Sequence, residues 1–314
     1  MPLSFFSEKK RIFAHDMELR QLKYFAKVAE LRSFSEAARV LYVSQSTLSQ
    51  QVRQLEHELD ATLLVRDSHR VELSDAGRAF LPSALRTLAE ADNSLDSIRN
   101  VKQLQTGVLR IGSTFTFSLL LGLVLRDFIG RYPSVKVEVV SDRMDELMTM
   151  LDHGQIDVAL SYRSLREYPN IQSTTLFDNH LAVVMSPTHP LADRAAIGLK
   201  DLEKCRLALP MKGMQARNTL DSLLAGSGLQ LHVQLEMNTL PTLLDLVAST
   251  HLVTLVSQAT ARMHKGLVAL PIEGIGATME GCYHVRRDSY LKCAAREFVR
   301  LLEANKTLGI MEMM

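Results

Sequence analysis

The chain has 314 residues, of which 46% are hydrophobic and 23% are charged, and its formal net charge at pH 7 is +1. This length predicts two globular domains with substantial cores, and the balanced charge gives no sign of a polyanionic partner. The first 16 residues hold no apolar run typical of a signal peptide, and the longest such run, Phe117 to Leu125, is too short to cross a bilayer, so we expect a cytoplasmic protein with no membrane partner.

The segment from Ser33 to Leu59 predicts two short helices joined by a tight turn. Ser33 and Glu36 have the spacing of a capping box, and Ser44 can cap the second helix. In both helices the apolar residues recur every three or four positions: Phe34, Ala37, Ala38 and Leu41 in the first, and Leu48, Val52, Leu55 and Leu59 in the second. This is the pattern of a helix-turn-helix unit.

The polar face of the second helix carries short amides, hydroxyls and one guanidinium: Gln45, Ser46, Thr47, Ser49, Gln50 and Arg53. Such side chains bind base edges and phosphates in a major groove, and they cluster in the half of a recognition helix that touches DNA. The alternative is a helix pair with a merely solvated polar face, since this geometry also occurs in domains that bind no nucleic acid.

The flanking sequence favours a DNA-binding unit. An amphipathic helix is predicted before the pair, from Leu19 to Ala29, and two short strands after it, at Leu63 to Val65 and Val71 to Leu73. Such a hairpin would act as the wing of a winged helix and lay three side chains along the backbone or in a minor groove: Arg66, His69 and Arg70. From Met17 to Asp75, eight Lys or Arg are balanced by nine acids, so we expect weak DNA binding by a single copy.

From Asp75 to about Leu104 the sequence predicts one long helix, capped at its amino terminus by Ser74. Its apolar positions recur at steps of about 3.5 residues, at Leu81, Ala84 or Leu85, Leu88, Ala91, Leu95, Ile98 and Val101. Such a stripe on a helix between two domains favours a seam between two chains, and hence a homodimer or homotetramer. The alternative is a helix wrapped in the core of one domain.

After Gly107, short β-rich segments alternate with helical ones, at Val108–Ser113, Val135–Ser141, Asp157–Tyr162, Leu181–Ser186, Arg206–Pro210, His232–Met237 and Leu252–Val256. This α/β pattern predicts parallel sheets with helices on both faces, in which ligands bind at the carboxyl ends of strands. We expect the chain to cross between two lobes around Phe177–His180 and again near Cys282–His284.

The candidate ligand site follows the first of these strands. Ser113, Thr114 and Thr116 lie in a hydroxyl-rich loop that leads into a helix amino terminus, which is a suitable seat for a small anion. Four further candidates lie on the facing lobe: Lys212, Gly213, Asn238 and Thr239. The alternative is that Thr116 only caps the helix and that Lys212 is a solvated loop lysine.

No motif supports catalysis or a bound cofactor. The sequence has no Gly-x-Ser-x-Gly elbow, no Walker loop and no His-Glu-x-x-His, and its ten histidines show no metal-ligand spacing. Cys205, Cys282 and Cys293 are scattered and odd in number, which favours free thiols over disulfides. We therefore expect a binding protein without metal or cofactor, and neither an enzyme nor an exported solute receptor.

Two stretches carry a family resemblance: MELRQLKYFAKVAELRSFSEAARVLYVSQSTLSQQVRQLEHEL from Met17 and LLVRDSHRVELSDAGRAFL from Leu63. They resemble the amino-terminal module of LysR-type transcriptional regulators, although Gln50 stands where that family commonly has Arg. The resemblance implies a winged helix-turn-helix at 17–75, a linker and dimerisation helix at 76–106, and a two-lobed effector domain with a periplasmic-binding-protein-like (type 2) fold at 107–314. Residues 1–16 lie outside the pattern, and we interpret them as an upstream start or a disordered arm.

The same resemblance implies lobe I at about 107–178 and 282–314, and lobe II at about 179–281. A small, anionic effector between the lobes would modulate binding to double-stranded promoter DNA. Thr250 and Leu252 stand where family members often carry Gly. The order of the motifs FTFS, ARNTLDSLLAGSGL and TLPTLLDLVASTHLVTLV resembles the branch that includes the cyanate-responsive regulator.

Overall fold

The computed structural model describes residues 17–67, 70–100, 107–164, 166–274, 278–287 and 291–307. The chain divides within its longest helix, so that an amino-terminal module extends to Leu95 and a carboxy-terminal domain begins at Asp96. Each is described by itself below. No helix within the described ranges is both long and apolar enough to span a membrane.

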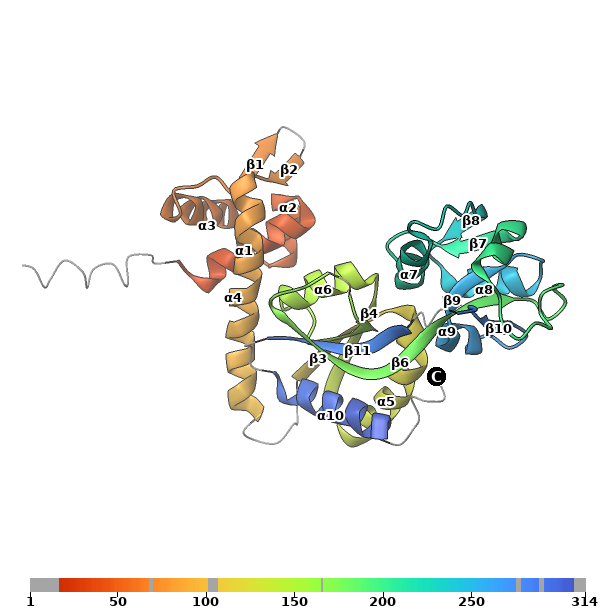
Figure 1. Ribbon diagram of the computed structural model, residues 1–314. Coiled ribbons are helices and arrows are strands. Elements are labelled where there is room, and N and C mark those ends of the chain that lie inside the picture. Colours follow the sequence, from red (N-terminus) through yellow and green to blue (C-terminus); the bar gives the residue numbers. More distant parts are fainter. Residues whose placement is uncertain are drawn as a thin grey trace, which may run out of the picture. The chain divides into compact units, whose positions relative to one another are not determined.

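The amino-terminal module consists of three short helices, a two-stranded hairpin and the start of the long helix (Figure 1): α1 Leu19–Leu31, α2 Phe34–Val40, α3 Gln45–Glu58, β1 Leu64–Asp67, β2 Arg70–Leu73 and α4 Asp75–Asn100. The caps at Ser33 and Ser44 are confirmed, because their hydroxyls accept hydrogen bonds from the N–H groups of Glu36 and Thr47 at 3.3 Å and 3.1 Å. Only half of the predicted capping box forms, since the Glu36 carboxylate binds Arg39 at 2.6 Å.

Apolar side chains from all three short helices form the core of this module. Leu48, Val52 and Leu55 of α3 are fully buried, as their spacing predicts. The Phe25 ring of α1 lies 5.7 Å from the Phe80 ring of α4. At Gly77, α4 passes close to the backbone just before β1, so that an added Cβ atom would lie 2.1 Å from the Leu63 carbonyl oxygen. This close approach of α4 requires a residue without a side chain.

Part of the apolar stripe predicted as a seam between chains is used within the subunit. Ala84 is buried in the module core, and Leu81 and Leu88 pack against it. The physical reason is that the core of so small a module is incomplete without the first turns of α4. The side chains of Leu95 and Ile98 and the whole of Val101 lie outside the described structure, so the seam between two chains stays a prediction.

A seven-stranded sheet forms the framework of the carboxy-terminal domain, in the order β10-β6-β11-β5-β3-β4 with β9 also paired to β6. Its strands are β3 Gly107–Ser113, β4 Val135–Ser141, β5 Val158–Tyr162, β6 Ile171–Met185, β9 Thr254–Ser257, β10 Val268–Pro271 and β11 Thr278–Arg286. A separate parallel pair is formed by β7 Arg206–Pro210 and β8 His232–Met237. The predicted strands are all present, but β10, β11 and the first two thirds of β6 were not anticipated.

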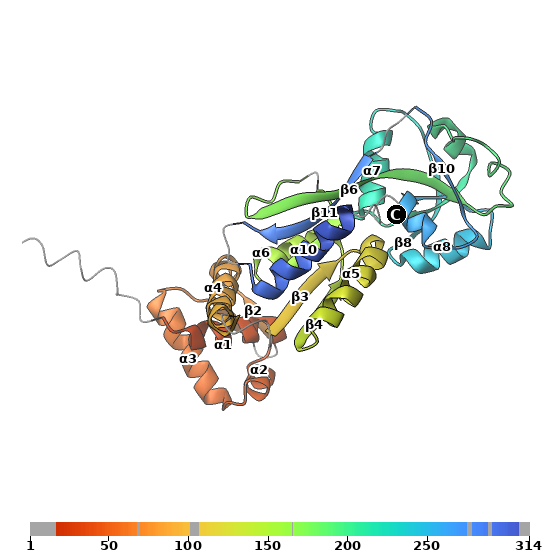
Figure 2. The same ribbon diagram turned by 90° about the horizontal axis from the view of Figure 1, so that it is seen from below.

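The prediction of wholly parallel sheets is wrong for half of this domain. Strands β3, β4 and β5 are parallel, whereas β11 runs antiparallel to β5 and β6, and both β9 and β10 run antiparallel to β6. The cause is β6, which pairs with β11 over Ile171–His180 and with β9 and β10 over Leu181–Met185, and so extends through both lobes (Figures 1 and 2). Strand β11 runs beside β6 in the opposite direction.

The two expected crossings between the lobes can be compared with this pairing. The first lies within β6, where its partner changes between His180 and Leu181, close to the expected Phe177–His180 segment. The second crossing, expected near Cys282–His284, stays a prediction. Gly281, the residue before that segment, pairs with Phe177 of β6, so the two expected crossing segments lie side by side.

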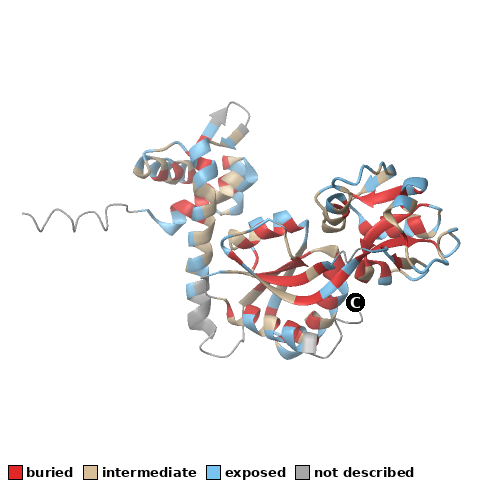
Figure 3. Ribbon diagram, viewed as in Figure 1, coloured by how far each residue is buried: buried red, intermediate tan, exposed pale blue. Residues whose placement is uncertain are grey.

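Helices cover both faces of the sheet. Those of lobe I are α5 Ser118–Arg131, α6 Met144–Asp152 and α10 Cys293–Thr307, and those of lobe II are α7 Gln215–Leu224, α8 Leu240–Ala248 and α9 Gln258–Arg262. In β5, Val158 and Leu160 pack with α5 and α10, whereas Ala159 packs with α6, as alternation along a strand requires. Figure 3 shows the buried residues concentrated along the strands and the inner helix faces.

Candidate functional site

The outward face of α3 is the first candidate site. Gln45, Ser46, Thr47, Gln50 and Arg53 are exposed and Ser49 is half-buried, opposite the buried stripe of the same helix. Five of these six residues line one shallow, open groove: Gln45, Ser46, Ser49, Gln50 and Arg53. The structure therefore turns the predicted reading face to solvent.

Several of these side chains are held by short-range hydrogen bonds. The Gln45 Oε1 atom accepts a hydrogen bond from the Ser35 hydroxyl at 3.0 Å, which ties the start of α3 to α2. The Ser44 hydroxyl lies 2.9 Å from that of Ser46 and 2.7 Å from that of Thr47. Thr47 thus belongs to the cap of the helix and does not line the groove.

The balance of charge around α3 depends on which cations are paired. Arg20, Lys27 and Arg39 each form an ion pair with a nearby glutamate, at 2.9, 2.5 and 2.6 Å. Arg53 forms no ion pair with any residue that the structure describes, and it is exposed in the groove. A module with no net basic charge therefore keeps an uncompensated guanidinium at the centre of its polar face.

The hairpin beside α3 exists as predicted, with Arg66 opposite Val71 and Asp67 opposite Arg70. The backbone of Arg66 and Arg70 thus lies in paired strands, while the side chains of both residues and the whole of His69 lie outside the described residues. The Glu56 carboxylate of α3 accepts hydrogen bonds from the N–H groups of Leu63 and Leu64 at 2.8 and 3.0 Å, which fixes the start of the hairpin against α3.

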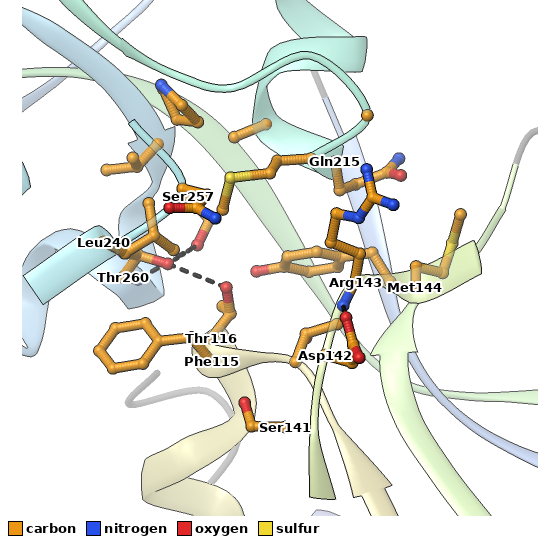
Figure 4. Close-up of a pocket in the computed structure, with 18 residues that line it drawn as sticks. Phe115, Thr116, Ser141, Asp142, Arg143, Met144, Gln215, Leu240, Ser257 and Thr260 are labelled. Carbon is orange, nitrogen blue, oxygen red and sulfur yellow. Dashed lines mark hydrogen bonds between the residues drawn. The ribbon is translucent and has the colours of Figure 1, made fainter. Parts of the chain in front are cut away.

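The second candidate site is a cavity of about 260 Å³ between the lobes of the carboxy-terminal domain (Figure 4). It is bounded in lobe I by the ends of β3, β4 and β5, and in lobe II by the segments that enter α7, α8 and α9. Its lining residues are Thr114, Phe115, Thr116, Ser141, Asp142, Arg143, Met144, Tyr162, Pro210, Gly213, Met214, Gln215, Ala216, Asn238, Leu240, Val256, Ser257 and Thr260.

Four of the seven residues nominated from the sequence line this cavity: Thr114, Thr116, Gly213 and Asn238. Ser113 is buried in β3, where its hydroxyl donates a hydrogen bond to the carbonyl oxygen of Thr114. Lys212 and Thr239 do not line the cavity, although they neighbour residues that do. None of these three residues is part of the cavity lining.

The sequence reasoning missed several polar residues of the cavity, above all Ser141, Arg143, Tyr162, Ser257 and Thr260. Ser141, Tyr162 and Ser257 are the last residues of β4, β5 and β9. Ligands of open α/β folds bind at the carboxyl ends of strands, so the last residue of each predicted strand was the available signal. It could be applied to β4 and β5, whose ends were predicted correctly.

A chain of hydroxyls connects the two lobes at the buried side of the cavity. Thr260 of α9 donates a hydrogen bond to the Thr116 hydroxyl at 3.2 Å, and Ser257 lies 2.8 Å from Thr260 (Figure 4). All three residues are buried. Because Thr116 belongs to lobe I and the other two to lobe II, this bond joins the lobes beside the cavity.

Two further polar atoms in the cavity wall are buried and have no hydrogen-bond partner of good geometry among the described residues: the Tyr162 hydroxyl and Thr114 Oγ1. Burial raises the pKa of Tyr162, and the Ser257 hydroxyl offsets part of that rise. Tyr162 is therefore a neutral hydrogen-bond donor.

The charged residues of the cavity lie at its exposed rim. The Arg143 N–H donates to the Asp142 carboxylate at 2.7 Å, and its guanidinium lies 3.3 Å from Glu146. The Arg143 side chain extends from lobe I toward lobe II, where a Cβ atom added at Gly213 would lie 3.6 Å from it. Figure 4 shows the guanidinium pointing toward the segment that carries Gln215.

Comparisons with known proteins agree with this architecture. Residues 102–306 match the family described as LysR substrate binding domain, and residues 19–78 match the family described as bacterial regulatory helix-turn-helix protein, lysR family. The Hca operon transcriptional activator HcaR of Escherichia coli (strain K12) is 37% identical over 60% of this chain and 63% of its own length. The HTH-type transcriptional regulator ShiR of Corynebacterium glutamicum (strain R) is 32% identical over 88% of this chain and 98% of its own length.

Among solved structures, full-length CbnR complexed with its target DNA is similar to this chain with a TM-score of 0.63 and 26% identity. That similarity covers 92% of this chain and 99% of CbnR. The alignments with the first three curated relatives span only 58–65% of those proteins.

Proposed function

The chain belongs to the LysR family of bacterial regulatory helix-turn-helix proteins, and from this premise we propose that it is a transcriptional regulator that binds promoter DNA and responds to a small, anionic effector. Its site of action would be the cytoplasm, where the promoter is accessible. The observation that carries the proposal is the outward face of α3, where amides, hydroxyls and the unpaired Arg53 line one open groove.

The chemistry of that face supports direct reading of bases. Glutamine forms paired hydrogen bonds with adenine, arginine does so with guanine, and serine hydroxyls bind either bases or phosphates. The anchoring of Gln45 by Ser35 lowers the entropy lost when its amide binds a base. The wing residues Arg66, His69 and Arg70 are proposed as additional contacts to the DNA backbone or minor groove.

Assembly of more than one copy supports this role. From Met17 to Asp75 the chain carries eight basic residues against nine acidic ones, so phosphate neutralisation by one copy is weak. Two or four copies on paired half-sites would multiply the contacts. The CbnR chain, which is similar to this one, was solved in complex with its target DNA and is thus a precedent for a full-length relative bound to DNA.

The cavity of the carboxy-terminal domain is proposed as the effector site. Thr114, Thr116, Gly213 and Asn238 remain the candidates from the sequence, and Tyr162 joins them. An effector held by both lobes would favour one relative placement of the lobes and so change DNA binding. The resemblance to the cyanate-responsive branch stays a prediction about which anion this is.

The DNA-binding proposal is tested with duplexes selected from a random library by the full-length protein. Gln45→Ala combined with Arg53→Ala is expected to weaken specific binding by about ten-fold to a hundred-fold per lost base contact, measured by fluorescence anisotropy at fixed salt. Gln54→Ala is the matched control, because Gln54 is exposed on the same helix but its amide binds Glu58. Equal binding by the double variant and the control would refute the assignment of α3.

A further inference from the structure

We propose that the cavity between the lobes takes a small monocarboxylate with a compact apolar body, whose carboxylate lies against Thr114 and Tyr162. This inference rests on the proposed function of the cavity as an effector site and specifies the chemistry of the effector. It is carried by three features: unpartnered donors at the buried end, charges that cancel at the rim, and apolar side chains in the wall between them.

The buried end of the cavity offers hydrogen-bond donors without acceptors. Buried polar atoms in folded proteins nearly always have a partner, yet the Tyr162 hydroxyl and Thr114 Oγ1 make no hydrogen bond of good geometry with the described residues. Tyr162 is only 4% exposed and lies at the carboxyl end of β5. Two such donors in one cavity wall indicate that an acceptor is supplied from outside the chain.

The backbone next to these donors also favours a negative charge. Thr114 precedes the short 3-10 helix Phe115–Phe117, which continues directly into the 14 residues of α5, and neither helix start receives a side-chain cap. The first N–H groups of a helix are unpaired within it and lie at its positive end. A carboxylate, which only accepts hydrogen bonds, matches this group of donors.

The rim of the cavity argues against a second negative charge on the ligand. Arg143 is the one cation among the described residues that line the cavity. Its backbone N–H donates to Asp142, its guanidinium lies 3.3 Å from Glu146, and its side chain is 55% exposed. The guanidinium is thus both screened by water and compensated by carboxylates. A dicarboxylate or a phosphate would bring its additional charge close to Asp142, whereas a monocarboxylate would not.

Apolar side chains form part of the remaining wall and limit the size of the ligand. Phe115, Met144, Met214, Leu240 and Val256 line the cavity. Its volume of about 260 Å³ is below the range of about 300–1,000 Å³ usual for drug-sized ligands. The flexible methionine side chains can close on a branched chain or a single ring. A body of a few carbon atoms or one ring therefore fits.

The test is calorimetric titration of the full-length protein with matched probes. We expect 3-methylbutanoate or benzoate to bind, and their primary amides, which keep the shape but lose the charge, to bind at least ten-fold more weakly. Three further probes are expected to bind at least ten-fold more weakly than the two monocarboxylates. They are valine, which is 3-methylbutanoate with an added ammonium group; phthalate, which is benzoate with a second carboxylate; and inorganic phosphate.

Variants then locate the carboxylate. Tyr162→Phe and Thr114→Val are each expected to weaken monocarboxylate binding by about ten-fold to a hundred-fold, because each removes one hydrogen bond to a charged group. Tyr162→Phe should leave the ligand-free protein at least as stable to heat, since it removes a buried hydroxyl that makes no hydrogen bond of good geometry with the described residues. Arg143→Gln should have a smaller effect than Tyr162→Phe. Tyr283→Phe is the control, because Tyr283 is also buried but its hydroxyl binds Glu303 at 2.8 Å.

Several results would overturn the inference: amides, valine, phthalate or phosphate binding as tightly as the monocarboxylates, no binding of either acid at millimolar concentration, or Tyr162→Phe behaving like Tyr283→Phe. Specific DNA binding by the ligand-free wild-type protein is measured on the same preparation. If that binding is present while the acids fail to bind, only this inference fails. If specific DNA binding is itself absent, the proposed function fails.

Discussion

Acidification is expected to destabilise the carboxy-terminal domain through one residue, His284. This histidine lies on β11 and is 1% exposed. Its Nε2 atom is 2.9 Å from the Ser161 hydroxyl, and its Nδ1 atom is 2.8 Å from the Ser173 hydroxyl. Because the Ser161 hydroxyl donates to the Tyr162 carbonyl oxygen, it accepts from Nε2–H, and Nδ1 accepts from Ser173. The neutral ring is thus fully hydrogen-bonded.

The pKa of His284 is lowered from 6.5 to about 4, chiefly by burial; the hydrogen bond with the Ser161 backbone opposes this decrease, and the nearby Arg163 adds a smaller one. In the unfolded chain the pKa is about 6.5. Since the folded value is the lower one, this contribution to stability is complete above pH 6.5 and is lost as the pH falls toward 4. The gap between the two pKa values corresponds to about 3 kcal/mol in total, of which about 2 kcal/mol is lost at pH 5.

The measurement is urea unfolding of the full-length protein at pH 7.5 and pH 5, followed by far-UV circular dichroism because the chain has no tryptophan. The free energy of unfolding of the wild type should fall by about 2 kcal/mol more than that of His284→Gln, whose amide does not titrate. His232→Gln, at an exposed position of β8, serves as the control and should follow the wild type. Parallel losses in the wild type and His284→Gln would refute the claim that burial holds this ring neutral.

Two further predictions concern packing and charge. Gly77→Ala should destabilise the amino-terminal module by about 2 kcal/mol or more in thermal melts, because its Cβ would lie 2.1 Å from the Leu63 carbonyl oxygen. The control Gly122→Ala, with open space around it, should be neutral or slightly stabilising. Equal melting temperatures for the two variants would contradict the clash. Lys292→Met should lower the free energy of unfolding by about 3 kcal/mol, because it strands the buried Asp157 carboxylate 2.9 Å away. Adding Asp157→Asn should recover part of that loss, and additive losses in urea unfolding would show that the two charges are not coupled.

The amino-terminal module could be predicted from the sequence almost to the residue. Ser33 and Ser44 cap helices through hydrogen bonds to residues three positions away, and the spacing of Leu48, Val52 and Leu55 is that of one helix turn. Interactions of such short range are encoded locally. The outward face of α3 follows directly, since burying one side of a helix exposes the other.

The carboxy-terminal domain was predictable in most of its strands but not in their pairing. The bounds of β4, β7 and β8 agree with the sequence prediction, whereas the antiparallel β11 and the length of β6 do not follow from it. Strand pairing depends on which distant segments share a sheet, and alternation of side chains along one strand does not specify its partner or direction.

The reading face of α3 was therefore determined by the sequence itself, because it depends on contacts within a few helical turns. The cavity was decided by the tertiary structure. Tyr162, Thr116 and Thr260 come from three elements far apart in the chain, and only the two crossings between the lobes bring them to one wall. Local sequence patterns identify the chemistry that a side chain can perform, whereas its partners depend on which distant segments the tertiary structure places beside it.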